Sequence, residues 1–315
     1  MNFEFPNERQ INEIEAYETF SKDFDYQVDF LQNLSELITY NGVVISFIAN
    51  ENIHILDTSL IDNSVQTLKS IKLCCSIGSF SDANTLIRKL RDDLILYIFV
   101  LDIIHNRKSF NEDDLNDFDF KNESFDAEKF TKSFLNIRFN NILTENEQVV
   151  DAWFNNTVNE LHFKIKKKLD FSNYMTHLQG NSNVNEILVH YNLQDYWENL
   201  RRKLNDYVHN NGVKFTRQNY ISANNKYIDT HLKNINIRVS YISSLFLVLL
   251  LMVNSKLISS TDLIDHLDGN IEPPEDCQYF IAKFIQEFID LKVSKLHPEL
   301  KAYLKDNNKY GMKIE

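Results

Sequence analysis

Apolar residues recur every three or four positions over long stretches of the chain, which is the period of an amphipathic helix. This spacing predicts helices over residues 24–40, 64–77 and 83–105. A short Gly-containing turn joins the last two, and Ser81 or Asp82 is expected as the N-cap of the second. These two segments therefore predict an antiparallel helical hairpin, the beginning of a bundle.

The second half of the chain continues this pattern. Residues 144–147 have the sequence of a capping box, which predicts the start of a long helix running to residue 169. Residues 179–185 are polar and are expected to form a linker. Further helices are expected over residues 196–209, 225–257, 279–293 and 298–306.

Three other regions do not predict a long helix. Residues 1–22 are polar and are expected to be a loosely packed lead-in. Residues 43–48 and 53–56 are short apolar runs that predict either a hairpin or a helix with a break, because periodicity does not separate the two at this length. Residues 106–129 are acidic with interspersed phenylalanines, and we interpret them as an excursion between helices.

The amino-acid composition also favours helices. The chain has 315 residues but only 6 glycines and 4 prolines, so residues that break helices or form tight turns are scarce. We therefore predict an all-α fold, a multi-helix bundle.

Charge and cysteine content narrow the function classes. The formal net charge of −12 argues against a general nucleic-acid coat, although it leaves room for a local basic site. Basic clusters occur at residues 164–168 and 201–203, and each also fits a solvated helix face. The three cysteines have neither a disulfide framework nor metal-ligand spacing. We therefore expect reduced thiols, a cytoplasmic protein, and neither metal nor cofactor.

One apolar run raises the question of a membrane. Residues 241–253 are shorter than the roughly 20 residues that cross a bilayer, and they contain Ser243 and Ser244. Extending the run backward meets Arg238. A core helix is therefore the favoured interpretation and no membrane is expected, with a membrane-associated segment over residues 235–253 as the alternative.

The strongest candidate for chemistry is the segment of residues 196–212, an amphipathic helix expected to stop at Gly212. Arg202 and His209 are seven residues apart, which is two helical turns, so both lie on one face. Glu198 and Asp206 lie close to that face. The bare spacing is a weak signal, and the position of the pair at the end of a strong amphipathic helix strengthens it.

The residues from Leu204 to Gly212, Leu-Asn-Asp-Tyr-Val-His-Asn-Asn-Gly, together with Arg202, resemble the active-site helix of HEPN domains. These are small α-helical bundles whose signature is an Arg and a His separated by about four to six residues. Six residues separate Arg202 from His209, and Lys203 stands where the family often has Asn, Asp or His. The resemblance implies an HEPN-like core over residues 61–257.

The remaining residues form two expected extensions of this bundle. Residues 1–60 are expected to form an N-terminal extension that is helical, with a short hairpin as the alternative left open above. Residues 258–315 are expected to form a C-terminal helical extension packed on the bundle.

The resemblance also implies metal-independent RNA cleavage with 2′,3′-cyclic phosphate products, in a toxin or antiviral defence system and by a homodimer. A histidine accepts or donates protons near neutral pH, and a guanidinium stabilises a phosphate, which fits His209 and Arg202. Asp206 is expected to orient His209, and Glu198 to hold Arg202. The residues expected to contact RNA are Arg201, Lys203, Lys164 and Lys167.

Structural alternatives stand beside this hypothesis. His209 fits a cation at a helix C-terminus, and Arg202 fits a surface pair with Glu198. Arg91 and Asp92 lie in an otherwise apolar helix and would supplement the site only if that helix packs beside it. The rival function is a non-catalytic module that binds a protein partner, such as an antitoxin, or a nucleotide. Five further histidines are expected to be structural and without arranged partners: His54, His105, His162, His177 and His190.

Overall fold

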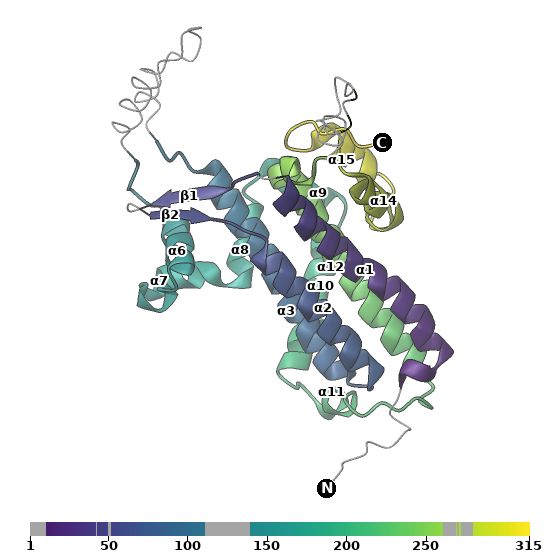
Figure 1. Cartoon of the computed structure of the whole chain (residues 1–315). Helices are drawn as coiled ribbons and strands as arrows, with labels where there is room; N and C mark the ends of the chain where they lie inside the picture. Colours follow the sequence, from purple (N-terminus) through teal and green to yellow (C-terminus); the bar gives the residue numbers. More distant parts are fainter. Residues whose placement is uncertain are drawn as a thin grey trace.

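Four long helices form the centre of the molecule (Figure 1). The computed structural model describes residues 11–41, 43–49, 52–110, 139–260, 269, 271 and 280–315. Most of the acidic excursion expected over residues 106–129 lies outside these. Helix α2 packs on α3, α3 on α12, and α1 on both α12 and α2, which closes a four-helix ring. The mostly α-helical fold is thus confirmed. The four helices are α1 (Glu15–Tyr40), α2 (Ser59–Ser76), α3 (Phe80–Asn106) and α12 (Ile228–Asn254).

Helix α12 is the most buried of these helices. From Tyr241 to Asn254 every residue is buried, and α12 packs most extensively on α3 and α1. A helix that is apolar all round belongs in a core or a bilayer. By length and composition alone the segment Ile228–Ile258 could cross a membrane, but most of its strongly apolar part is buried inside the protein.

The hairpin of α2 and α3 has the connection that was expected and a different cap. Helix α3 begins at Phe80, so the prediction of Ser81 or Asp82 as its N-cap is wrong. The cap comes instead from Asn219, whose Oδ1 accepts hydrogen bonds from the backbone N–H groups of Ser81 (2.9 Å) and Asp82 (3.1 Å). A side chain 138 residues away along the chain therefore satisfies the open end of α3.

Gly78, in the turn before α3, has a φ of +74°, a conformation that favours glycine. The space of a Cβ at this position is also taken, since it would lie 2.0 Å from the carbonyl oxygen of Ile221. The segment that follows α11 (Val213–Arg217) thus packs directly on this turn.

The short runs after α1 form a β-hairpin, which settles the alternative left open by their periodicity. Strands β1 (Ser46–Ala49) and β2 (Asn52–Ile55) pair antiparallel, with Ser46 opposite Ile55. The expectation of a loosely packed lead-in is wrong for residues 11–22. A 3₁₀ turn at Ile11–Glu13 precedes α1, and Ile11, Tyr17 and Phe20 are buried.

The long helix predicted from residue 145 to residue 169 is wrong in its second half. Helix α6 (Glu145–Phe154) has the predicted capping box, but it ends at Asn156, which adopts a φ of +59°. The N–H of Thr157 then bonds the carbonyl of Ala152 at 2.8 Å, a Schellman-type stop. The chain continues in short pieces: η3 (Val158–Glu160), α7 (Phe163–Lys166), η4 (Lys167–Leu169), α8 (Phe171–Leu178) and α9 (Ser182–His190).

The C-terminal segment packs against the ring. The rings of Phe288 in α14 (Lys283–Leu291) and Phe30 in α1 stack with centroids 3.6 Å apart. Helix α15 (Leu300–Asn307) contacts α12. Helix α10 (Leu193–Val208) and two shorter elements, η5 (Ser255–Ile258) and η7 (Val293–Lys295), complete the described chain.

Candidate functional site

Helix α10 carries the candidate site and lies against α3. Its inner face consists of Trp197, Leu200 and Leu204, all buried, whereas Arg202 and Lys203 are exposed on the outer face. The apolar spacing thus fixes which side of the helix faces solvent.

The end of α10 is made by an asparagine. Asn210 adopts a φ of +47°, and the N–H of Asn211 bonds the carbonyl of Asp206 at 3.0 Å, as in a Schellman motif. The prediction of Gly212 as the helix stop is therefore wrong. Gly212 is the N-cap residue of α11 and has a φ of +142°, outside the range of most L-residues. His209 occupies the C-cap position and is exposed.

Arg202 and His209 are both accessible to a ligand. The Nη2 of Arg202 donates to Asn199 Oδ1 at 2.6 Å, and no carboxylate among the described residues pairs with it. Within the same described ranges, the imidazole of His209 makes no hydrogen bond or ion pair. Seven residues of helix separate them by about 10 Å along the axis. Arg202 and His209 are therefore better placed to contact neighbouring groups along one extended ligand than to contact the same atom.

The two expected supporting carboxylates have other partners. Glu198 accepts from the Nε of Arg201 at 2.9 Å, one turn away, so it does not hold Arg202. Asp206 accepts from the Nδ2 of Asn211 at 2.9 Å, which ties it to the helix-ending turn and not to His209. Glu198 has two arginines within reach on its own helix, at spacings of three and four, and pattern alone does not rank them.

Further cations that sequence reasoning missed lie near the end of α10. Lys214 and Arg217 are exposed on α11, which begins four residues after His209. Arg238 of α12 reaches over the ring of Tyr207, with its Cζ 5.5 Å from the ring centroid. The first two could have been found from their position directly after the motif; the third is 31 residues beyond Tyr207 and needs the fold.

The lysine cluster at residues 164–168 lies elsewhere. Helix α7 packs on α6 and η4, and in Figure 1 it lies beneath the β-hairpin, well away from α11. Lys164 and Lys167 are thus not brought to the end of α10. The Nζ of Lys167 lies 4.5 Å from the ring centroid of Phe163, and Lys168 forms an ion pair with Glu145 at 3.3 Å.

Arg91 meets the condition set by the sequence, because α3 does pack beside α10, yet it does not supplement the site. The residue is only 1% exposed, and its Cζ lies 3.9 Å above the ring of Phe171. Its Nε donates to Asp92 Oδ1 at 2.8 Å. Burial lowers the pKa of Arg91 and raises the pKa of Asp92, while the attraction between the two opposes both shifts. Arg91 is therefore a buried cation that holds α3, α8 and α10 together.

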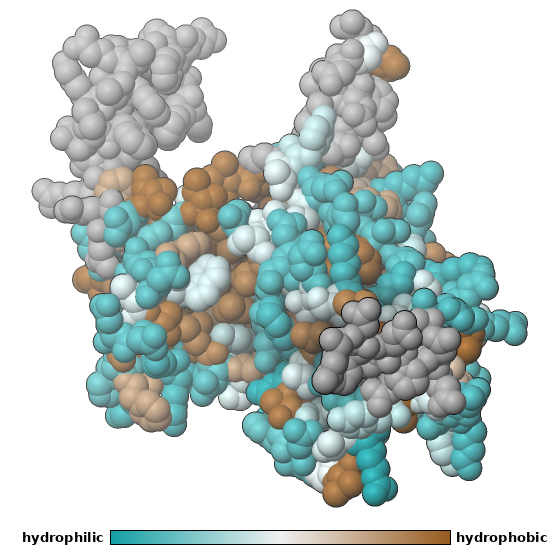
Figure 2. Space-filling model, turned by 60° about the horizontal axis from the view of Figure 1, so that its bottom comes forward, coloured by the Kyte–Doolittle hydropathy of each residue, from teal (hydrophilic) through white to brown (hydrophobic). Residues whose placement is uncertain are grey.

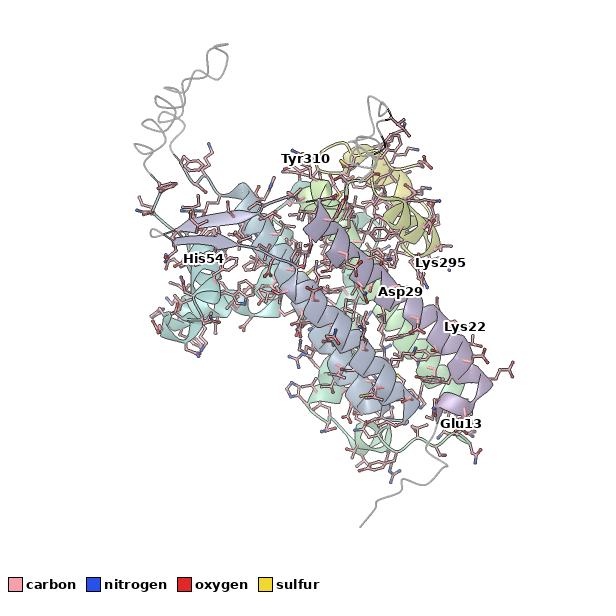
Figure 3. The ribbon with its side chains drawn as sticks, viewed as in Figure 1. Glu13, Lys22, Asp29, His54, Lys295 and Tyr310 are labelled. Atoms are coloured by element: carbon pink, nitrogen blue, oxygen red, sulfur yellow. The ribbon has the colours of Figure 1, made fainter. Side chains whose placement is uncertain are left out.

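The prediction that the other histidines lack arranged partners is wrong for three of them. The Nε2 of His177 lies 2.8 Å from Asp102 Oδ2, and its Nδ1 lies 3.1 Å from the Nδ2 of Asn146. Because both ring nitrogens are engaged, the pair ties α8 to α3 and α6 and leaves no free nitrogen for proton transfer. Two similar contacts are those of His54 with Asp151 and of His105 with Tyr310; Figure 3 shows His54 at the β-hairpin and Tyr310 at the top of the molecule.

No protein-family model, curated protein or solved structure matches the chain. Within the described ranges, no group of three or more His, Cys, Asp or Glu side chains has an arrangement that could hold a metal ion. The HEPN resemblance therefore rests on the residues from Arg202 to Gly212.

Proposed function

We propose that the protein is a metal-independent endoribonuclease of the HEPN type, with Arg202 and His209 as its catalytic residues. The observation that carries this proposal is that the side chains of Arg202 and His209 are both accessible to a ligand. Both side chains are exposed on the last two turns of α10, and neither is neutralised by a carboxylate of the described chain.

The proposed reaction uses the two residues for different tasks. The ribose 2′-oxygen attacks the adjacent phosphorus, the bond from phosphorus to the 5′-oxygen breaks, and a 2′,3′-cyclic phosphate forms. His209 transfers the proton, either from the 2′-hydroxyl or to the leaving 5′-oxygen. Arg202 binds the non-bridging oxygens, where negative charge is concentrated as the new bond forms.

Local charge supports an RNA ligand despite the net charge of −12. Lys203, Lys214 and Arg217 are exposed near the end of α10. Figure 2 brings the α11 end of the molecule forward and shows a hydrophilic surface with small apolar spots. Exposed Tyr220 (64%) follows His209 in the chain and offers an aromatic face on which a base can stack.

The wider biological role follows the resemblance alone. We propose a cytoplasmic toxin or antiviral nuclease, held in check by a protein partner such as an antitoxin. Each chain has one Arg/His pair, so a two-fold homodimer would bring two α10 ends into one cleft.

Cleavage of total RNA and short labelled RNAs in EDTA tests the proposal. His209→Asn is expected to lower the rate at least about 100-fold, the usual contribution of a general acid or base. His190→Asn is the matched control, because His190 is also exposed at the end of a helix, α9. Arg202→Ala should lose activity, and Arg202→Lys should regain part of it. Equal rates for the two histidine variants would remove His209 from the mechanism.

The rival function, a non-catalytic binding module, predicts a different result. A module that binds a protein partner or a nucleotide would neither cleave labelled RNA nor retain it, whereas retention that weakens steeply with salt would indicate phosphate contacts with RNA. Retention that is unchanged by Arg202→Ala would place RNA binding away from α10.

A further inference from the structure

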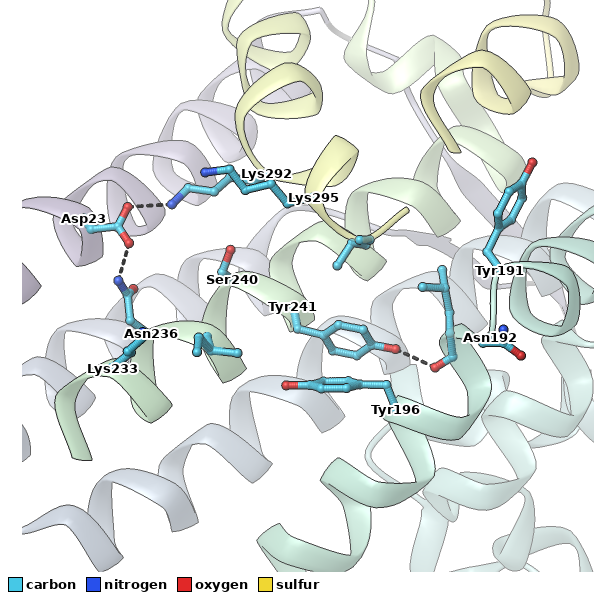
Figure 4. Close-up of a pocket in the computed structure, with 13 residues that line it drawn as sticks. Asp23, Tyr191, Asn192, Tyr196, Lys233, Asn236, Ser240, Tyr241, Lys292 and Lys295 are labelled. Carbon is cyan, nitrogen blue, oxygen red and sulfur yellow. Dashed lines mark hydrogen bonds and ion pairs between the residues drawn. The ribbon is translucent and has the colours of Figure 1, made fainter. Parts of the chain in front are cut away.

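A cavity of about 620 Å³ opens at the other end of α10, between α1, α12 and the segment after α14 (Figure 4). This volume is in the range of small-molecule sites. The ring of helices forms its floor, so the cavity is part of the folded core and does not depend on the loop at His209.

The lining of the cavity is cationic. Lys233, Lys292 and Lys295 contribute to it, against a single carboxylate, Asp23, and Figure 4 shows Lys233 on α12, away from Lys292 and Lys295. The lining therefore has a formal charge of +2, from three ammonium groups and one carboxylate, in a chain whose net charge is −12. Such a local reversal of sign is unfavourable unless a ligand or solvent compensates it.

The three lysines are not equivalent. Lys292 is buried and donates to Asp23 Oδ1 at 2.6 Å, while Asn236 donates to the other oxygen of the same carboxylate. Lys233 and Lys295 are exposed and form no ion pair with any residue in the described ranges. Asp23 thus fixes one ammonium group and leaves two free to bind an anion.

One wall of the cavity is aromatic and apolar. The rings of Tyr196 and Tyr241 lie 4.2 Å apart between centroids, and the Tyr241 hydroxyl is held by a 2.7 Å hydrogen bond to the carbonyl of Leu193. Tyr196 remains 40% exposed, so part of its ring is open to a ligand. Figure 4 shows Lys292 and Lys295 on one side of the cavity, the two tyrosines on the other, and Ser240 between them.

We infer that this cavity binds a small organic phosphate that carries a planar ring. The phosphate dianion matches the two unpaired ammonium groups, and the ring matches the open face of Tyr196. A phosphate alone would leave the aromatic wall unused, and a neutral ring would make no contact with the charge of the lysines. The site is separate from Arg202 and His209, and the inference stands whether or not the protein cleaves RNA.

Calorimetric titration of the full chain with phenyl phosphate, AMP, inorganic phosphate and phenol tests the inference. Phenyl phosphate or AMP should bind at least 10-fold more tightly than inorganic phosphate, and phenol should not bind. Tighter binding of AMP than of phenyl phosphate would identify a nucleotide as the source of the phosphate, and the reverse order a simpler aryl phosphate. Absence of binding by both ring-bearing phosphates would overturn the inference.

Two sets of variants separate the walls of the cavity. Lys233→Gln combined with Lys295→Gln should weaken binding of every phosphate at least 10-fold, whereas Lys305→Gln, an exposed lysine on α15, should leave it unchanged. Tyr196→Ala should weaken phenyl phosphate and AMP but not inorganic phosphate, and Tyr196→Phe should restore them. Unfolding curves for each variant exclude loss of fold as the cause. Equal affinity in the double lysine variant and the wild type would overturn the inference.

Discussion

Asn219 caps the central helix from a distant loop, and replacing it tests how the site end of the molecule is held. Its Oδ1 accepts from the N–H of Ser81 at 2.9 Å, from the N–H of Asp82 at 3.1 Å and from the hydroxyl of Ser79 at 3.2 Å. Its Nδ2 donates to Asp82 Oδ1 at 3.0 Å. Asn219→Ala removes all four contacts without adding a bulky group.

The expected loss can be worked out from these contacts. Replacing a capping side chain by Ala costs about 0.5–2 kcal/mol of unfolding free energy. We expect a value near the upper end, about 2 kcal/mol, because two backbone donors lose the same acceptor and Ser81 is buried, where an unsatisfied N–H is costly. For a chain of this size that corresponds to a fall in Tm of roughly 3 °C.

Urea unfolding followed by far-ultraviolet circular dichroism measures this loss. Thr216→Ala is the control, because Thr216 is exposed on the neighbouring α11 and its hydroxyl bonds no residue in the described ranges. The control should stay within about 0.5 kcal/mol of the wild type. If Asn219→Ala unfolds at the same urea concentration as Thr216→Ala, the segment after α11 does not cap α3 in solution.

Two further predictions concern stability. Gly78→Ala should lower the unfolding free energy by about 2–4 kcal/mol, because Gly78 has a φ of +74° and an added Cβ would meet the carbonyl oxygen of Ile221; a chemical-unfolding midpoint equal to that of the wild type would contradict the packing described. Burial, followed by the nearby charge of Arg238, lowers the pKa of His231 in the folded protein. The neutral imidazole therefore contributes fully to stability above the pKa of the unfolded chain, roughly 6.5, and this contribution is lost as the pH falls through the lower pKa of the folded protein. The rings of His231 and Phe80 lie 4.9 Å apart between centroids, and His231→Phe keeps a ring at this position. Unfolding curves measured at each pH should show that the variant loses less stability below pH 6.5 than the wild type. An identical pH dependence would refute this.

The helices could be predicted because apolar residues recur with a clear helical period. Several of their C-terminal ends could not be predicted, because in this chain asparagine often takes the place of glycine after the last turn. With few glycines available, Asn156, Asn192 and Asn210 take the left-handed conformation after α6, α9 and α10. Asparagine tolerates this conformation but is common throughout the chain, so it does not mark a boundary by itself. Gly212 looked like the stop of α10 and instead begins α11.

The candidate site was predictable only where its contacts are local. The position of Arg202 and His209 on α10 follows from spacing along one helix. Other groups near the end of α10 depend on the fold, since Arg238 of α12 reaches the ring of Tyr207 from 31 residues further along the chain. Glu198 had two arginines at helical spacing and pairs with Arg201, a choice that depends on side-chain geometry.

The measurement that tests the central claim most directly is the chemistry of the RNA ends. Short labelled RNA is incubated in EDTA with the wild type and with His209→Asn, and the 3′ ends of the products are identified. We expect 2′,3′-cyclic phosphate ends with the wild type and none above background with the variant. Products with 3′-hydroxyl ends, or cyclic ends that persist in His209→Asn, would contradict it.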